Sequence, residues 1–344
     1  MSGWRSACVV AMLMMAGAVC AQQRVIIDTD PGTDDALAIF LALNSPEVKV
    51  EAFTVVPGNV VAEQGLENAL KLVGVAGRCD VPVAAGAKNP LLQKTYTATY
   101  WHGKNGIADI ELPASKCKAD PRFAPDLIIE LIHKHPHEIT LIPVGPLTNI
   151  ALAVIKDPSI VELTKNIVIM GGSISGGNVT GVAEANIFGD PEAAEIVFKA
   201  GWTVTMVGSD VGEQTLMRRK ELTALEAGHG PVNDVVTKIS WFYIERSEKN
   251  GWDGAAMYDP LAVAVAFDPT LVTLKEMHID VETRGEFTRG ETVPNRNLEN
   301  EKNVLHRDHY EIEGYEKLGV NAKVAVASDA QRFLTMFIER VKGK

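Results

Sequence analysis

The sequence predicts an α/β protein with an open, mainly parallel central sheet and helices on both faces. Short runs rich in β-branched residues alternate with longer segments whose apolar residues recur at helical spacing. The short runs are nearly all apolar, as is typical of strands that are buried on both faces. Because crossover helices join parallel strands in this alternating pattern, we expect one sheet that is covered by helices on both sides.

The predicted strands and helices follow one another in order along the chain. The first pairs, strand before helix, are 24–28 with 34–45, 50–56 with 60–77, and 139–144 with 146–157. A strand at 166–172, a helix at 190–201 and a strand at 203–210 come next, and an apolar helix lies within 255–267. These segments supply the strands of the predicted sheet and most of the helices that cover it.

Three stretches do not fit the alternation. Residues 87–125 and 211–258 are poorer in strand patterns, and we expect them to be insertions that border a pocket. Residues 280–310 are polar and charged, which predicts a hairpin or a loop.

The composition predicts one large domain over residues 24–344. Of the 344 residues 46% are hydrophobic, which is enough apolar material for a large core, and there is no internal repeat or linker rich in Pro or Ser. The net charge of −11 disfavours non-specific binding to nucleic acid or to an anionic membrane, because both require clustered Lys and Arg.

Residues 1–21 have the pattern of a signal peptide. A short segment with one Arg precedes the apolar stretch 7–19, and small residues then offer a cleavage site. We expect cleavage after Ala21 and an exported mature protein, periplasmic or secreted, without a membrane anchor. The alternatives are lipidation at Cys20, for which Val19 is a poor match, and a buried N-terminal helix, which the polar residues after Ala21 disfavour.

Two cysteines, Cys79 and Cys117, remain in the expected mature chain. An oxidising compartment would permit a disulfide between them, but two cysteines do not define a framework. Their spacing leaves open whether they meet.

Polar or turn-forming residues follow each predicted strand. The carboxyl ends of parallel strands lie along one edge of a sheet, where open α/β sheets bind ligands. In chain order these residues are Asp28, Asp30, Asp34 and Asp35, then Pro57-Gly58-Asn59, Val144-Gly145-Pro146, Gly171-Gly172 and Ser209-Asp210.

The four aspartates in IIDTDPGTDDALAIF (26–40) are a dense group of like charges. A cation among them would relieve their repulsion, and carboxylate oxygens are the ligands of hard divalent cations such as Ca²⁺. An EF-hand loop is excluded because the positions of its Gly and final Glu hold Thr33 and Ile39. The absence of a His/Cys cluster at ligand spacing disfavours zinc and copper.

The aspartate cluster has two alternative explanations. Asp34 and Asp35 begin a predicted helix, where acidic side chains cap the backbone and favour the helix dipole; capping explains one or two aspartates but hardly four. The other alternative is a phosphotransfer enzyme with Asp-x-Asp-x-Thr after its first strand. Here Pro31-Gly32-Thr33 follows Asp30, which is one residue too many, and GSD (208–210) supplies one later acid where two are needed.

Two further groups of polar residues are candidates for ligand binding. Asn178, Glu184 and Asn186 lie on a Gly-rich loop and suit hydrogen bonding to a polyhydroxyl ligand, although a loop before a helix capped by Asp190 has the same composition. Asp259 opens an apolar helix, and Tyr258 before it reads equally well as a packed aromatic.

Together these segments resemble the nucleoside hydrolase family, in its inosine–uridine-preferring and purine-preferring branches. The resemblance runs from about residue 24 almost to the end. It rests on DTDPGTDDALA (28–38), PGN (57–59), VGPLTNIA (144–151), MGG (170–172), NVTGVAEANIFGDPEAA (178–194) and YDPLAVA (258–264), which follow the family's order. It implies the Rossmann-like sheet of that family, hydrolysis of ribonucleosides to free base and ribose, a bound Ca²⁺, and a homodimer or homotetramer.

The resemblance also implies roles for matched residues. Asp30, Asp35, the backbone carbonyl of Val144 and the carboxylate of Asp259 correspond to Ca²⁺ ligands. Asp30 corresponds to the general base that activates water, and Asn59 and Asn178 match further residues near the reacting centre. The remaining matches concern the substrate: Asp34 and Asn186 for the ribose hydroxyls, Asn178 and Glu184 for the 5′-hydroxyl, and His102 in WHGKNGIAD (101–109) for the base.

One position departs from the inosine–uridine-preferring pattern. Tyr258 stands where that branch commonly has His, which is proposed to protonate the leaving base, whereas the purine-preferring branch has an aromatic Trp there. Tyr could stack on a base in the same way, so we expect a preference for purine nucleosides, although Asn59 resembles the inosine–uridine type. The alternative is a nucleoside-binding protein that has lost turnover. Aromatic residues that could wall the base pocket are Trp241, Phe242, Tyr243 and Trp252.

Overall fold

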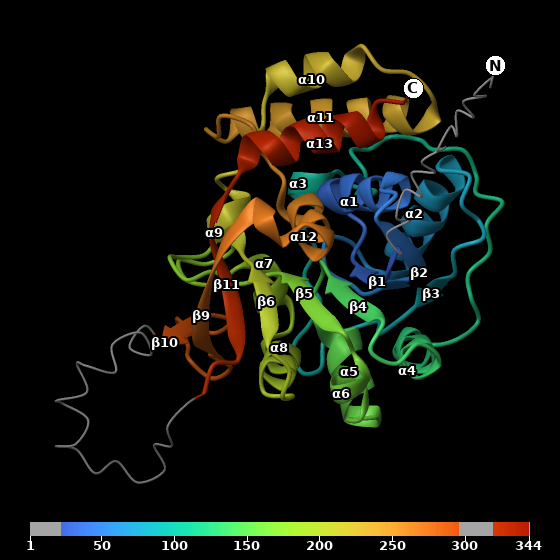
Figure 1. Ribbon diagram of the computed structural model, residues 1–344. Coiled ribbons are helices and arrows are strands. Elements are labelled where there is room, and N and C mark those ends of the chain that lie inside the picture. Colours follow the sequence, from blue (N-terminus) through green and yellow to red (C-terminus); the bar gives the residue numbers. More distant parts are fainter. Residues whose placement is uncertain (1–21, 296–318, 344) are drawn as a thin grey trace, which may run out of the picture.

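The centre of the molecule is a twisted sheet (Figure 1). The computed structural model describes residues 22–295 and 319–343, and within them nine strands form this sheet in the order β10-β9-β11-β6-β5-β4-β1-β2-β3. The strands are β1 (Gln23–Thr29), β2 (Val48–Val55), β3 (Val83–Ala85), β4 (Ile139–Pro143), β5 (Asn166–Met170), β6 (Val204–Val207), β9 (Val272–Val281), β10 (Thr292–Asn295) and β11 (Ala322–Ser328).

Most of the sheet is parallel, as predicted. All neighbours from β11 to β3 pair in parallel, and only β9 is antiparallel, to both β11 and β10. The strand order reverses between β1 and β4, which pair directly, with Asp28 opposite Pro143. Loops diverge at such a reversal and leave a crevice at the carboxyl ends of the strands. The fold therefore locates a ligand site next to the aspartates that follow β1.

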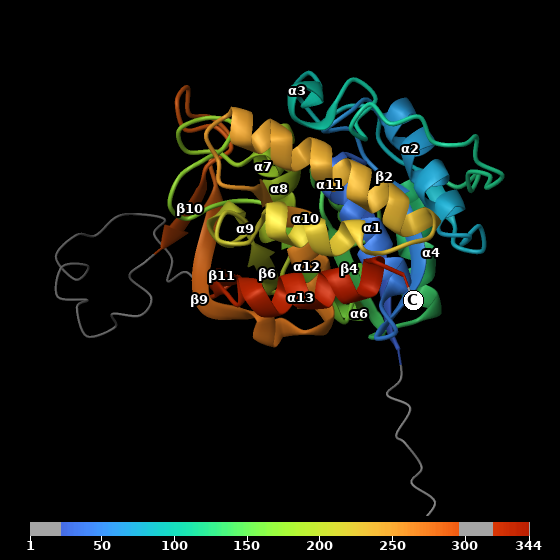
Figure 2. The ribbon, with the colours of Figure 1, turned by 90° about the horizontal axis from the view of Figure 1, so that it is seen from above.

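Helices cover both faces of the sheet, because successive side chains of its buried strands point to opposite sides. Val25 and Ile27 of β1 belong to the apolar core on one face, whereas Ile26 belongs to the core on the other. The first face is covered by α1 (Thr33–Asn44), α2 (Ala62–Val75) and α12 (Tyr258–Phe267), and by an outer layer of α10 (Arg219–Glu226), α11 (Pro231–Lys249) and α13 (Ala330–Val341) (Figures 1 and 2). The second is covered by α4 (Ala124–Lys134), α5 (Thr148–Lys156), α6 (Ile160–Leu163) and α8 (Pro191–Phe198).

Short elements connect these layers near the carboxyl edge of the sheet. They are α3 (Thr99–His102), α7 (Ala185–Gly189), α9 (Ser209–Gly212), the 3₁₀ turn η1 (Pro269–Leu271) and a two-stranded ribbon of β7 (Leu216–Met217) and β8 (Ala255–Ala256). In the part of the chain that the structure describes, no helix is both long and apolar enough to span a membrane.

The predicted elements from 24 to 210 are all present, and no predicted boundary differs from the observed one by more than three residues. The segment 211–258 holds more regular structure than predicted, because α11 alone covers 19 residues of it. Within 280–310, the end of β9 and β10 form an antiparallel hairpin, while 296–318 lies outside the described residues, as does the expected signal peptide over 1–21.

Cys79 and Cys117 form a disulfide, which answers the question that their spacing left open. The bond joins the turn after α2 to the segment before α4, across a sequence separation of 38 residues. It therefore ties the strand-poor segment 87–125 to the body of the domain.

Candidate active site

A cavity of about 440 Å³ opens at the carboxyl ends of the parallel strands. The predicted site residues that line it are Asp34, Asn59, His102, Val144, Asn178, Glu184, Asn186, Tyr258 and Asp259. Asp30 and Asp35 lie behind this lining and are almost fully buried. Both strand-poor segments contribute to the walls, which confirms that they border a pocket.

Asp30 directly follows β1, and its carboxylate is held on one side only. Its Oδ2 accepts a hydrogen bond from the backbone N–H of Asn59 at 2.7 Å, whereas Oδ1 is buried and has no partner among the described residues. Two glycines make room for it, since a Cβ on Gly58 would lie 2.0 Å from Oδ2 and one on Gly145 would lie 2.6 Å from Oδ1. The turns after β2 and β4 therefore require glycine because Asp30 occupies the space between them.

Asp35 is saturated with hydrogen bonds. Its Oδ1 accepts the Thr29 hydroxyl and the backbone N–H of Asp30, and its Oδ2 accepts the N–H of Gly32 and the side-chain amide of Asn59. The bond to Gly32 caps the start of α1, so the capping explanation holds for this residue. Capping does not exclude a metal role, because each carboxylate oxygen has further lone-pair directions.

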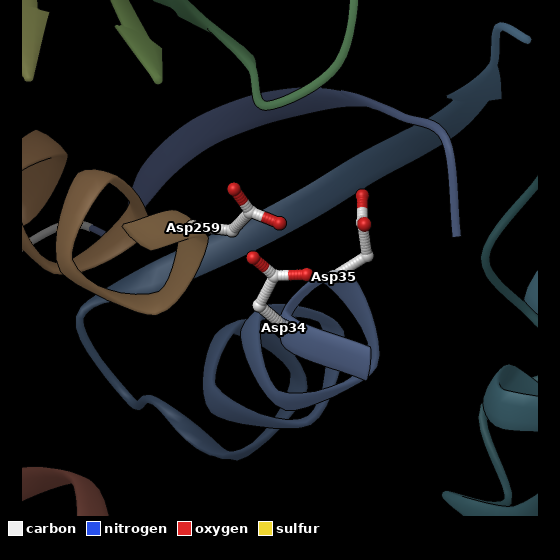
Figure 3. A group of neighbouring side chains, drawn as sticks. All are labelled: Asp34, Asp35 and Asp259. Atoms are coloured by element: carbon white, nitrogen blue, oxygen red, sulfur yellow. The ribbon is translucent and has the colours of Figure 1, made fainter. Parts of the chain in front are cut away.

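Asp34 and Asp259 face one another across the floor of the cavity (Figure 3). Each of Asp34, Asp35 and Asp259 offers a carboxylate oxygen, and these oxygens lie within 4.8 Å of one another. Asp34 and Asp35 come from the start of α1 and Asp259 from the first turn of α12, and these helices pack together. The family resemblance implies a role toward the sugar for Asp34, and the structure also includes this residue in the carboxylate cluster.

The electrostatics of the cluster fit a cation. Burial raises the pKa of Asp34 to about 6 and, with the neighbouring carboxylates adding to it, raises the pKa of Asp30 and Asp259 well above the usual range. The buried oxygens Asp30 Oδ1 and Asp34 Oδ1 accept no hydrogen bond from any described residue, and Nδ1 of His102 lies 3.6 Å from the latter. Buried anionic oxygens without donors are unfavourable unless a positive charge lies among them. An all-oxygen donor set of this kind suits a hard divalent ion.

Val144 lines the same cavity, and its backbone carbonyl is engaged by a side chain. It accepts a hydrogen bond from Nδ2 of Asn186 at 2.8 Å, and the same amide also donates to the carbonyl of Met170. Asn186 therefore links the ends of β4 and β5, and both Val144 and Asn186 lie on the cavity wall.

The loop residues Asn178 and Glu184 shape the cavity as well as lining it. Glu184 caps α7, because its carboxylate accepts the N–H groups of Asn186, Ile187 and Gly172. Asn178 Oδ1 accepts the N–H of Ala185 at 2.9 Å. The capped-loop explanation is therefore correct for their backbone contacts, and the side chains still reach the cavity.

His102 has a defined tautomer. Its Nδ1 accepts the backbone N–H of Thr33 at 3.1 Å and lies 2.7 Å from the Thr33 hydroxyl, so the ring proton is on Nε2. Burial lowers the pKa of His102 to about 4. The imidazole is therefore neutral at pH 7 and offers Nε2–H as a hydrogen-bond donor.

Tyr258 is packed into the wall rather than free in the cavity. A Cβ on Gly212 would lie 2.1 Å from its ring, so only glycine at 212 leaves room for it. Its side chain hydrogen-bonds with Asn178, and burial together with the nearby Glu213 raises its pKa. The ring thus has a fixed position beside Asp259.

The structure corrects three expectations about the site. Asp28 does not line the cavity, because its carboxylate faces Thr54 and Asn149, which donate to it at 2.6 and 2.8 Å. Trp241 is 45% exposed, and neither it nor Phe242 lines the pocket. Tyr243 and Trp252 do line it, as predicted.

Residues that the sequence analysis missed also line the cavity. They are led by Tyr96, Trp101 and Glu213. Trp101 could have been predicted, because it directly precedes His102. Glu213 could not, because it belongs to no recognisable sequence pattern.

Comparison with known proteins agrees with this geometry. The family model described as inosine-uridine preferring nucleoside hydrolase matches residues 25–335. An inosine-uridine preferring nucleoside hydrolase of Leishmania major is 44% identical over 79% of this chain and 87% of that protein. A pyrimidine-specific ribonucleoside hydrolase of Citrobacter koseri is 37% identical over 92% of this chain and 97% of that protein.

Solved structures show the same relationship. A plant nucleoside hydrolase superimposes with a TM-score of 0.86 at 36% identity, covering 94% of this chain and 99% of the other. A purine-preferring ribonucleoside hydrolase from Gardnerella vaginalis gives a TM-score of 0.83 at 36% identity, covering 93% and 98%. The chain therefore belongs to the inosine-uridine preferring nucleoside hydrolase family and is an N-glycosidase that hydrolyses ribonucleosides.

Proposed function

We propose that this protein is an exported, Ca²⁺-dependent ribonucleoside hydrolase that prefers purine nucleosides. The observation that carries the proposal is the group of buried carboxylates at and just behind the floor of a cavity large enough for a nucleoside, in which oxygens of Asp30 and Asp34 accept no hydrogen bond from any described residue.

The acidic floor suits the charge that develops during the reaction. Breaking an N-glycosidic bond builds positive charge on the ribose in an oxocarbenium-like transition state. The carboxylates of Asp34 and Asp259 already face the cavity, and they stabilise this charge more than they stabilise the neutral substrate. Differential stabilisation of this kind lowers the barrier.

The carboxylates that the structure brings together as potential ligands of a divalent cation are those of Asp34, Asp35 and Asp259. Asp30 and the backbone carbonyl of Val144 would join them as the ligands that the family resemblance implies. When bound, such an ion lowers the pKa of nearby water and attracts the ribose diol. We favour Ca²⁺ because every candidate ligand is an oxygen, with neither Cys nor a ligating His in the group.

Asp30 acts as the general base in this proposal. Its Oδ2 is fixed by Asn59 and its Oδ1 is free of partners, so Oδ1 accepts the proton of the attacking water. Asp34 and Asn186 orient the ribose hydroxyls, and Asn178 with Glu184 receives the 5′-hydroxyl. A nucleoside that lacks the 2′-hydroxyl should therefore be hydrolysed far more slowly than a ribonucleoside.

The preference for purines rests on Tyr258. Its ring is held against Gly212 beside Asp259, where offset stacking on a base contributes about 0.5–1.5 kcal/mol. His102 offers Nε2–H to the leaving base in its neutral form. The relatives carry both purine and pyrimidine preferences in their names, so the base preference of this chain requires its own measurement.

Export and assembly complete the proposal. The signal-peptide pattern of residues 1–21 and the Cys79–Cys117 disulfide both support an oxidising compartment, periplasmic or extracellular. A homodimer or homotetramer is proposed from the family resemblance alone. The mass of the secreted mature chain, expected to begin after Ala21, tests the export part.

The decisive experiment is a panel of ribonucleosides assayed for reducing sugar, with 2′-deoxyinosine as the control. We expect base release from inosine and guanosine to exceed that from uridine, and almost none from 2′-deoxyinosine. Equal or faster hydrolysis of uridine would refute the purine preference. Stoichiometric nucleoside binding without base release would instead support the binding-protein alternative.

A further inference from the structure

The outer wall of the cavity is built from two segments far apart in sequence. Trp101 and His102 come from α3, and Tyr243 and Ser247 come from α11, with Trp252 just beyond it. Figure 2 shows α3 next to α11, and the two helices pack against each other. Because α3 has only four residues and lies in the strand-poor segment, it cannot be stable without contacts to its neighbours.

Arg246 of α11 makes one of the contacts that join them, together with the ring of Tyr243, whose centre lies 6.2 Å from that of His102. The Arg246 guanidinium lies 4.7 Å from the ring centre of Tyr100 on α3 and 5.1 Å from that of Phe242. Tyr100 also donates a hydrogen bond through its hydroxyl to Oδ1 of Asn250 at 3.1 Å. Arg246 forms no salt bridge with any described residue, so the two rings are its main partners. A planar guanidinium can stack on two aromatic faces, which an ammonium cannot do equally well.

The position of Tyr100 connects this contact to the cavity. Tyr100 is 59% exposed, so burial alone does not fix it. Its ring meets Trp101 edge-on at 5.5 Å between ring centres, and His102 follows directly. A displacement of Tyr100 would therefore move Trp101, whereas His102 is also held by Thr33 and by the ring of Tyr243.

We infer that Arg246 is a positioning residue that fastens Tyr100 of α3 to α11 and so holds Trp101 against the base of a bound nucleoside. The inference rests on the proposed function, because it assigns the acidic floor to the sugar and the α3–α11 wall to the base. Arg246 itself does not line the cavity and acts only through Tyr100. Its loss should weaken recognition of the base while leaving recognition of ribose intact.

The test compares Arg246→Ala with a matched control, Arg219→Ala. Arg219 makes a similar cation–π contact with Trp241, at 5.9 Å, and it also pairs with Glu248, but neither partner lines the cavity. We expect Arg246→Ala to raise KM for inosine about tenfold with kcat changed far less. The inhibition constant of D-ribose should stay the same. Arg219→Ala should leave KM unchanged.

A second variant keeps the inference falsifiable. Tyr100→Ala should raise KM as Arg246→Ala does, and the double variant should be no worse than either single one, because both break the same contact. The inference is overturned if KM for inosine stays near the wild-type value in Arg246→Ala, or if the ribose inhibition constant rises in step with KM. A wild-type protein without turnover would refute the proposed function instead, so the two failures are distinguishable.

Discussion

Asp30 and Asn59 are joined by a 2.7 Å hydrogen bond from the backbone N–H of Asn59 to Oδ2 of Asp30. The bond fixes the carboxylate and leaves Oδ1 buried without a partner among the described residues. Asp30→Asn keeps the size of the side chain but removes the proton acceptor. We expect kcat for inosine to fall by roughly 10²–10⁴-fold, the usual contribution of a general base. Release of reducing sugar measures this, and activity within a few-fold of wild type would refute the assignment.

Gly145 offers a test of geometry that removes no polar group from the site. A Cβ at this position would lie 2.6 Å from Oδ1 of Asp30 and 2.9 Å from Val56, so Gly145→Ala must displace the carboxylate. We expect kcat to fall about 10²-fold, because small misplacements of reacting groups are costly. Gly181→Ala is the control, since a Cβ there meets nothing within 4 Å. Equal activity of both variants would contradict the steric role.

Two substitutions of Tyr258 distinguish the contribution of its ring from that of its hydroxyl group. Tyr258→Phe retains the ring but loses the hydrogen bond with Asn178, whereas Tyr258→Ala loses both. We expect Tyr258→Ala to reduce kcat/KM for inosine more than for uridine, by about tenfold. Tyr258→Phe should leave the ratio of kcat/KM for inosine to kcat/KM for uridine unchanged. If Tyr258→Ala lowers kcat/KM for both substrates equally, stacking does not set the base preference.

Cation removal should destabilise the protein in a pH-dependent way. Without the ion, burial raises the folded-state pKa of Asp34 to about 6 and of Asp28 to about 7, above unfolded values of about 3.9. A raised folded pKa favours the folded state at low pH, and this contribution is lost as pH rises through the folded pKa. The Tm of the metal-free protein should therefore fall between about pH 4 and pH 7.

Added Ca²⁺ should reverse this loss, and the gain should be larger at neutral pH than at acidic pH. At a hundredfold excess over its Kd the ion contributes about 2.7 kcal/mol to the free energy of unfolding. Thermal unfolding after exhaustive chelation, with and without Ca²⁺, measures the effect. A metal-free Tm that does not depend on pH and does not respond to Ca²⁺ would contradict the cation site.

The Cys79–Cys117 disulfide closes a loop across 38 residues. Replacing both cysteines with Ser should lower the free energy of unfolding by about 2–4 kcal/mol, as measured in urea. Reductant should destabilise the wild type similarly and leave the double variant unaffected. A wild-type protein whose stability is insensitive to reductant would show that the bond does not form in solution.

Much of the fold follows from local pattern. Strands such as Ile139–Pro143 are continuous apolar runs, and helices such as Thr33–Asn44 repeat apolar residues at helical spacing, so both kinds of element could be predicted. Helix α11 was missed even though Val235, Ile239 and Tyr243 recur every four residues on its buried side. The charged residues between these apolar positions make the helical periodicity hard to recognise in the sequence.

The site was less accessible to sequence reasoning than the fold. Aspartates after a buried strand indicated the cluster, but Asp28 turns toward Thr54 and Asn149, which depends on the pairing of strands distant in sequence. Glu213 reaches the cavity because the chain after β6 packs beside Tyr258, and no local pattern encodes such a contact. Tertiary packing also decides whether Cys79 and Cys117 meet, and explains why Trp252 lines the cavity whereas Trp241 does not.

The packing of α12 against α1 has a consequence for when this molecule becomes active. Asp34 and Asp35 emerge early in synthesis, and Asp259 emerges only when most of the polypeptide exists. A nascent or truncated chain that ends before α12 lacks Asp259 and thus one wall of the acidic pocket, so we expect it to be inactive. Nucleoside hydrolysis should therefore begin only after α12 has folded against α1.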